Sequence, residues 1–169
     1  AIELQKAGNL TQARSMYLEA LQIEPHNHQL YKVLSSLEYQ NRNFDKSLKY
    51  IDEAIKFEKN SSELYSIKGF YLYTNNKEKE AKELFEKALK LNSDNIDALL
   101  NLGVILKENN ETQKAIDYFD RIISIDENNY KALVNRAYIK IDIRNYQDAL
   151  KDINKVLSLN KKYFNGYLM

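Results

Sequence analysis

The residues best suited to chemistry are two histidines, His26 and His28, which stand two positions apart in the stretch EPHNHQ. Such a pair in a turn could begin a metal site or a nuclease motif. A zinc site, however, needs three or four converging ligands, and the chain has no cysteine to complete one. We therefore expect surface histidines in a turn, with no metal and no cofactor.

Two carboxylates, Asp117 and Asp120, stand close enough on a helix to suggest an acid–base pair. Lys114 and Arg121 lie beside them, and this mixture of charges is typical of a solvated helix face. The four glycines are spread along the chain, so no glycine-rich phosphate loop is present. The sequence therefore predicts that this chain is not an enzyme.

Composition restricts the class of partner. The 169 residues include 25 basic and 24 acidic side chains, which give a net charge of +1 and are interspersed, so we expect no nucleic-acid partner. No apolar run approaches the roughly 18 residues of a membrane span, so we expect no membrane partner.

The chain has no cysteine, so it can form no disulfide bond and has no thiol chemistry. The sequence does not specify a cellular compartment, and the cytoplasm is our default expectation. The chain opens and stops inside expected helices, so we expect a segment of a longer protein.

The elements that must position any site follow a fixed period, in which positions n and n + 34 carry residues of one kind. Alanine recurs at this spacing twice over, in the series Ala20, Ala54, Ala88 and the series Ala81, Ala115, Ala149. One column is always small (Ser35, Gly69, Gly103, Ala137), and another is always large and apolar (Tyr17, Ile51, Phe85, Phe119, Ile153). A fixed period with helical patterning inside each unit is typical of a helix–turn–helix solenoid.

Each column has a physical reason. Two helices approach closely only where the contacting side chains are small, so Gly103 and Ala115 mark the contact between the helices of one pair, and Phe119 fills the space beside it. One pair cannot bury its apolar stripe alone, so neighbouring pairs must stack. We expect first helices at 29–41, 63–75, 97–109 and 131–143, and second helices at 10–23, 44–58, 78–92, 112–126 and 146–160. Asn9, Asn43 and Asn145 precede second helices, where an amide oxygen can cap the helix.

These columns resemble the tetratricopeptide repeat family, whose pattern is a small residue in the first helix followed by Ala, a large aromatic and Ala in the second. The resemblance covers the whole chain and implies an all-α, right-handed α-solenoid of stacked antiparallel helix pairs. It implies one array: a partial repeat at 1–27, full repeats at 28–61, 62–95, 96–129 and 130–163, and the start of another at 164–169. The proline that the family favours late in each repeat appears only as Pro25.

The resemblance also implies that the first helices line a concave groove. Carried over position by position, the candidate partner-binding residues are Lys32, Ser36, Tyr39, Ser66, Phe70, Tyr73, Asn101, Val104, Lys107, Lys131, Asn135, Tyr138 and Ile141. The set is unusually apolar, which is typical of a partner site. The alternative is that neighbouring first helices bury these rings against one another.

Two known binding modes of the family match only in part. The chaperone clamp grips a peptide carboxylate with lysine, asparagine and arginine; here Asn101 and Lys131 match, but Ser66 and Phe70 stand at the first two places and Asn135 replaces the arginine. We reject this mode. In the asparagine ladder of O-GlcNAc transferase arrays, successive amides hold a peptide backbone, and only Asn101 and Asn135 occupy that position.

A third mode, in which an apolar or amphipathic segment docks on aromatic rings, suits this sequence best. We expect Phe70, Tyr73 and Tyr138 to anchor the segment, with Lys107 and Lys131 meeting its acidic residues. The sequence therefore predicts a protein-interaction module that binds a partner peptide or helix. One alternative is the substrate-recruiting arm of a larger enzyme, for example of the glycosyltransferase type. Another is a spacer that associates weakly with itself through exposed solenoid ends.

Overall fold

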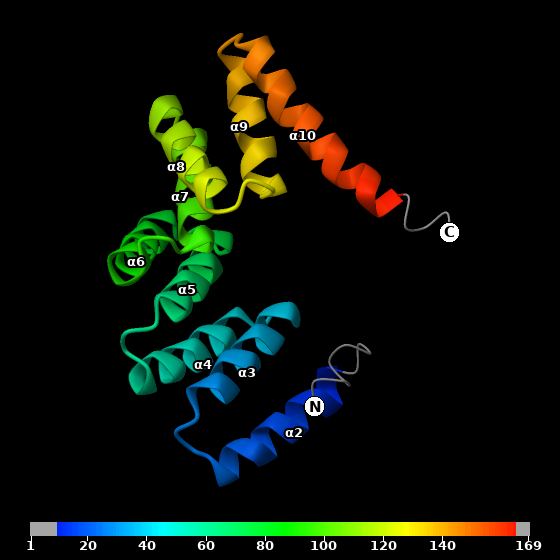
Figure 1. Cartoon of the computed structure of the whole chain (residues 1–169). Coiled ribbons are helices and arrows are strands. Elements are labelled where there is room, and N and C mark those ends of the chain that lie inside the picture. The colour runs from blue at the N-terminus through cyan, green and yellow to red at the C-terminus, as the bar shows by residue number, and fades with distance from the viewer. Residues whose placement is uncertain (1–9, 165–169) are drawn as a thin grey trace. The chain divides into compact units, whose positions relative to one another are not determined.

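The computed structural model describes residues 10–164, and side-chain surroundings for 11–159. This part of the chain contains nine helices and no strand (Figure 1). They are α2 (Leu10–Ile23), α3 (His28–Gln40), α4 (Phe44–Phe57), α5 (Ser62–Thr74), α6 (Glu78–Leu91), α7 (Ile96–Glu108), α8 (Thr112–Ile125), α9 (Tyr130–Asp142) and α10 (Tyr146–Phe164). The predicted all-α solenoid of helix pairs is confirmed.

Helix bounds agree with the periodic pattern to within one residue, with one exception. The exception is α10, which continues to Phe164, four residues beyond its predicted end. No helix of the described chain has the length and apolar character that a bilayer span requires. The repeat boundaries stay a prediction.

Contacts along the chain divide it into two units, Ala1–Ser93 and Asp94–Met169. In the described part of the first unit, α3 packs on α4 and α5 on α6, while α4 also packs on α5 and α2 on α3. In the second unit, α7 packs on α8 and α9 on α10, and α9 contacts both α7 and α8. Each unit is therefore built from helix pairs whose neighbours stack.

The small column lies where the two helices of a pair meet. An ideal Cβ atom built on Gly69 would lie 2.8 Å from Phe85, and one built on Gly103 would lie 2.8 Å from Phe119. Both phenylalanine rings are fully buried. Any side chain at the two glycines would overlap these rings, so close packing requires glycine at both positions. This requirement outweighs the lower helix propensity of glycine.

The turn inside each pair contains a feature that the periodic pattern did not reveal. Arg42, Asn76, Asn110 and Arg144, which hold the same place in successive repeats, have φ between 59° and 62°. The following N–H donates to the carbonyl five residues back, for example from Asn43 N to Glu38 O at 2.8 Å. This is a Schellman ending of the first helix, with the left-handed residue directly after the cap.

The predicted caps are partly wrong. Asn43 makes no cap, because its Nδ2 donates instead to Glu38 at 2.8 Å, whereas Asn145 Oδ1 does accept from Asp148 N at 3.3 Å. Asn9 lies outside the described residues. Side-chain caps instead begin the first helices, and the capping residues are Asn27, Ser61, Asn95 and Asn129. A second helix follows a Schellman turn that already orients the chain, so it depends less on a cap.

Candidate partner-binding site

All thirteen candidate residues lie on first helices. In the first unit, α3 carries Lys32, Ser36 and Tyr39, and α5 carries Ser66, Phe70 and Tyr73; in the second unit, α7 carries Asn101, Val104 and Lys107, and α9 carries Lys131, Asn135, Tyr138 and Ile141. Contacts among them are found within each unit. The expected anchors therefore divide into Phe70 and Tyr73 in one unit and Tyr138 in the other.

In the first unit, Tyr39 organises a cluster of rings. Its ring stacks on Tyr71 with centroids 4.4 Å apart and meets Phe70 and Phe44 at 5.6 Å each. Its hydroxyl donates to Thr74 Oγ1 at 3.1 Å, which links α3 to the end of α5. Phe70 is still 38% exposed. We call Tyr39, Phe70 and Tyr73 the aromatic face; its exposed ring, Phe70, lies against the rings of Tyr39 and Tyr71.

Sequence reasoning missed Tyr71, which supports this face from below. Tyr71 is 5% exposed and stands in a column otherwise filled by Leu37, Ile105 and Ile139, so the pattern marks it as core. Burial raises the pKa of Tyr71, and the hydroxyls of Ser35 and Ser36 act in the opposite direction. The polar end of the ring was the available signal, because a tyrosine in a core column needs a polar neighbour.

Two candidates of the first unit are less available than the groove pattern implied. Lys32 Nζ donates to both carboxylate oxygens of Glu63 at 3.0 Å, which ties α3 to α5. Ser66 is only 3% exposed, so its expected place on an open surface is wrong. The charge of Lys32 is thus paired with Glu63 of the same chain. The surface that stays available in this unit is therefore mainly the apolar surface of the aromatic face.

In the second unit, the amides expected as ladder rungs bind their own helices. Asn101 Nδ2 donates to the carbonyl of Asp97 at 2.7 Å, and Asn135 Nδ2 donates to that of Lys131 at 2.9 Å. Asn135 Oδ1 also accepts from Lys107 Nζ at 2.7 Å. Because Asn135 uses both ends of its amide, it offers little to an extended peptide, and Lys107 is held between α7 and α9.

An apolar groove opens between α9 and α10, with a volume of about 210 Å³. We call it the terminal groove; it is lined by Val134, Ala137, Tyr138, Ile141, Ile153, Val156 and Leu157. Tyr138 is 60% exposed and Leu157 is 53% exposed. Val104 is half-buried on α7 and does not line it. Large apolar side chains thus remain open to solvent at this place.

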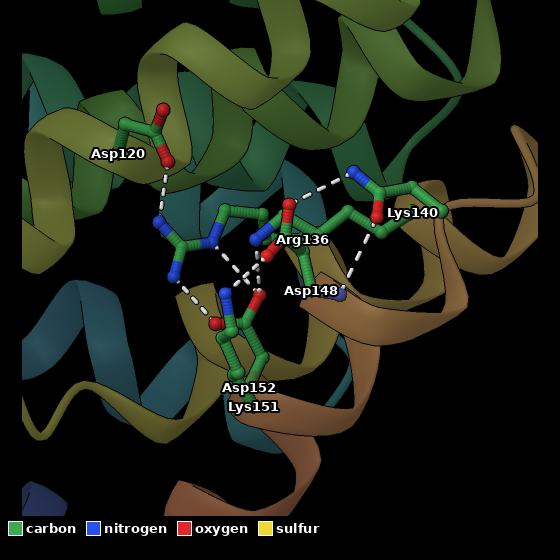
Figure 2. A network of polar contacts seen from close by, with 7 residues as sticks. Asp120, Arg136, Lys140, Asp148, Lys151 and Asp152 are labelled. Carbon is green, nitrogen blue, oxygen red and sulfur yellow. Dashed lines mark hydrogen bonds and ion pairs between the residues drawn. The ribbon is translucent and has the colours of Figure 1, made fainter.

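A charged network crosses the second unit (Figure 2). Arg136 of α9 lies between Asp120 of α8 and Asp152 of α10, and its Nε donates to Asp152 Oδ2 at 2.9 Å. Lys140 Nζ donates to the same oxygen at 3.0 Å. Burial by itself raises the pKa of Asp152, but the hydrogen bonds from Arg136 and Lys140 outweigh it, and the pKa lies below its ordinary value.

This network corrects our interpretation of the nearby carboxylates. Asp120 is part of an ion pair with Arg136 between neighbouring helix pairs, and is not merely solvated. Asp117 instead accepts from Gln113 at 3.0 Å on its own helix. The two carboxylates thus have separate partners, and each has a structural contact.

The histidines also have ordinary neighbours. The His26 ring packs against Phe57 with centroids 4.9 Å apart, and His28 Nε2 lies 2.9 Å from the amide nitrogen of Gln29. Among residues 10–164, no three side chains of the types that bind metals come together.

Comparison with known proteins gives two family matches. The family described as "Tetratricopeptide repeat protein 21 N-terminal ARM repeat" matches residues 40–169, and the family described as "Tetratricopeptide repeat" matches residues 1–62. A search of curated proteins finds no match.

Solved structures share the fold at low sequence identity. MamA aligns with a TM-score of 0.77 at 20% identity, over 96% of this chain and 95% of its own. PilF of Pseudomonas aeruginosa aligns with a TM-score of 0.84 at 18% identity, over 93% of this chain and 72% of its own. YrrB, described as a TPR protein with an unusual peptide-binding site, aligns with a TM-score of 0.67 at 17% identity, over 95% of this chain and 83% of its own.

Proposed function

The chain belongs to the tetratricopeptide repeat family, and from this premise we propose that it is a protein-interaction module that acts by binding and not by catalysis. Its partner presents an apolar or amphipathic segment. The aromatic face of the first unit receives that segment, and Phe70 is its principal anchor.

The exposure of Phe70 beside two packed tyrosine rings is the observation that carries this proposal. The ring is 38% exposed although Tyr39 and Tyr71 lie within 5.6 Å and 6.3 Å of it. An exposed aromatic side chain that is already held in place loses little conformational entropy when a partner covers it. Such residues typically contribute most of the free energy of binding at an interface.

The polar contacts support an apolar mode of recognition over a charged one. Lys32 is paired with Glu63, and Lys107 is bound to Asn135. A peptide carboxylate would have to break these contacts to reach either cation, which reduces the gain from a charged bond. YrrB, which shares the fold, is described as having a peptide-binding site. We therefore expect neither Lys32 nor Lys107 to form a strong charged bond with the partner segment.

A selection of displayed peptides on the whole chain, followed by binding measurements on variants, tests the proposal. We expect Phe70→Ala to weaken the selected peptides about 30-fold, which corresponds to about 2 kcal/mol of binding free energy. Tyr73→Ala should weaken them less, because this ring is half-buried. Phe57→Ala is the matched control, because Phe57 is similarly exposed, at 40%, but lies at the end of α4.

Circular dichroism of each variant separates binding from folding. If the selected peptides are acidic without apolar residues, or if Phe70→Ala binds them as well as the parent does, the aromatic face is not the site. If Phe70→Ala unfolds the chain, the ring is part of the core, and the alternative of rings buried between neighbouring helices is correct.

A further inference from the structure

The rings of the aromatic face stand at an angle to one another. The ring planes of Tyr39 and Phe70 are tilted by 54°, with their centroids 5.6 Å apart. Phe44, at the start of α4, meets Tyr39 edge-on at 71°. Phe70 is exposed, whereas Tyr39, Tyr73 and Phe44 are half-buried. The face therefore offers inclined ring surfaces of limited exposed area.

The charges on the two helices that carry this face are already paired. Histidine aside, every charged side chain of α3 and α5 forms an ion pair within the chain, and the pairs are Glu38 with Arg14, Lys32 with Glu63 and Lys68 with Asp52. A segment rich in charge would have to compete with these pairs. A segment without charge therefore complements the face best.

Neutral hydrogen-bond donors border the same face. Gln40 follows Tyr39 as the last residue of α3, and Asn75 follows Thr74 directly after α5. The hydroxyl of Tyr39 donates to Thr74 Oγ1, so these two helix ends lie beside each other. Both amide side chains are exposed, and neither forms a hydrogen bond with another residue among 11–159. Two amide NH₂ groups are thus available next to the rings.

We propose, building on the function proposed above, that the segment received by the aromatic face is proline-rich and binds in the polyproline II conformation. Proline rings pack on aromatic side chains in this mode of recognition. The conformation has no internal hydrogen bonds, so its carbonyl oxygens are free to accept from Gln40 and Asn75. It has three residues per turn, so prolines at positions i and i+3 contact the face along one edge.

An amphipathic helix fits these observations less well. Its carbonyl groups are bonded within the helix except in the last turn, so it makes little use of two donors beside the rings. It also docks through anchors spread over two turns, whereas the exposed aromatic area of this face belongs mainly to Phe70. A polyproline II segment is already stiff before it binds, so it loses less conformational entropy and needs a smaller surface.

Binding of two labelled probes to the whole chain, measured by fluorescence anisotropy, tests the proposal. One probe is a peptide of fourteen prolines, and the other is a leucine–lysine peptide of the same length with helical spacing. We expect the proline probe to bind with a Kd below about 1 mM and at least about tenfold more tightly than the helical probe. Raising the NaCl concentration from about 50 to about 300 mM should change its Kd less than about twofold, because no ion pair forms.

Variants test the two parts of the site separately. Phe70→Ala should weaken binding of the proline probe about tenfold, and Phe70→Tyr should retain it, because the second variant keeps a ring. Gln40→Ala and Asn75→Ala should each weaken it about three- to tenfold, the loss of one hydrogen bond. Gln22→Ala is the matched control, because Gln22 is also an exposed amide but lies on α2. Circular dichroism should show the same helix content in all of these variants.

The display selection distinguishes this proposal from the proposed function. Selected peptides with prolines three residues apart, each of which is needed for affinity, support both. If the selected peptides lack proline, or if the helical probe binds more tightly, while Phe70→Ala still weakens binding, the face receives apolar segments but the proline-rich class is wrong. If Phe70→Ala weakens no selected peptide, both proposals fail. Full affinity of the proline probe for Gln40→Ala and Asn75→Ala would also overturn this inference, and that result holds even if Phe70→Ala does not fold.

Discussion

The Cβ atom that Gly103 lacks would lie 2.8 Å from Cε1 of Phe119. The absence of a side chain at one position therefore makes room for a ring at the other, and the spacing of α7 and α8 depends on the pair. The other repeats show the same compensation in sequence. Glycine at 69 stands with phenylalanine at 85, whereas the larger Ser35 and Ala137 stand with the smaller Ile51 and Ile153.

Replacing Gly103 by alanine should destabilise the chain by about 1 to 3 kcal/mol. Alanine favours the helix by about 1 kcal/mol, but its methyl group would overlap the fully buried ring of Phe119, and we expect the cost of overpacking to outweigh the gain. The free energy of unfolding in urea measures the balance. A net stabilisation near 1 kcal/mol would show that the ring moves aside freely.

The double variant Gly103→Ala with Phe119→Ile reproduces the pair found at Ala137 and Ile153. It should recover part of the stability lost in Gly103→Ala, so the two changes should not be additive. Hydrogen exchange should place the loss in the single variant mainly in α7 and α8, because each pair contacts only its neighbours. Equal loss of protection throughout the chain would contradict a stack of pairs.

Replacing Arg144 by glycine should stabilise the chain by about 0.5 to 1 kcal/mol. Arg144 has φ of 62°, where a side chain with a Cβ atom is strained and glycine is not. Asn76→Gly is the matched control in an equivalent turn; asparagine tolerates this conformation better, so its gain should be smaller. Thermal and urea unfolding of both variants measure the difference, and a larger gain at position 76 would refute the strain argument.

Stability should depend on pH through Asp152. Its pKa in the folded chain lies below the ordinary value near 3.9, so the unfolded chain takes up a proton at higher pH than the folded chain does. The stabilising contribution is complete above about pH 4 and is lost as the pH falls through the lowered pKa. Asp152→Asn should cost about 2 kcal/mol at pH 7, because it weakens the contacts of a buried carboxylate with Arg136 and Lys140.

The matched control for this prediction is Asp120→Asn. Asp120 bonds the same arginine, but its side chain is 51% exposed against 5% for Asp152, so the change should cost less than about 1 kcal/mol. Urea unfolding at pH 7 and at pH 3 measures both. The difference in the free energy of unfolding between the parent and Asp152→Asn should shrink at the lower pH. A difference that stays constant would show that Asp152 is not the source of the pH dependence.

Asn95→Ala should cost about 1 kcal/mol, since the Asn95 side chain accepts from Ala98 N at 2.8 Å and caps α7. Its effect should be local, with faster exchange of the amide hydrogens in the first turn of α7. Asn43→Ala should instead act through Glu38, whose carboxylate is buried and also paired with Arg14. Faster exchange at the start of α4 alone would contradict this assignment.

Most of the fold could be predicted because its causes are local and repeat. Helix length, the apolar stripe and the small column are properties of single helices, so the periodic pattern places all nine helices of the described chain. The left-handed residues in the turns were missed because two of the four are arginine, which gives no signal for this conformation, and asparagine gives only a weak one. Only glycine would have marked them clearly.

The candidate site was less predictable, because exposure and bonding depend on neighbouring helices. Helical spacing by itself puts Phe70 and Tyr138 on the outer faces of first helices, and both are exposed. The same spacing placed Ser66 in the open, but the folded chain buries it. Spacing also could not show that Lys107 would bond Asn135 on the next first helix, since both partners look like free polar groups in the sequence.

The sequence by itself thus determined the helices, their pairing and the face of each helix that carries the rings, because helical periodicity and side-chain size act within one or two turns. Tertiary structure alone decided which of those side chains are still available. It brings Tyr39, Phe70 and Tyr71 into one cluster from two helices, and it joins α8, α9 and α10 through Arg136. These contacts connect residues on different helices, so they exist only once the stacking of neighbouring pairs has set the distances.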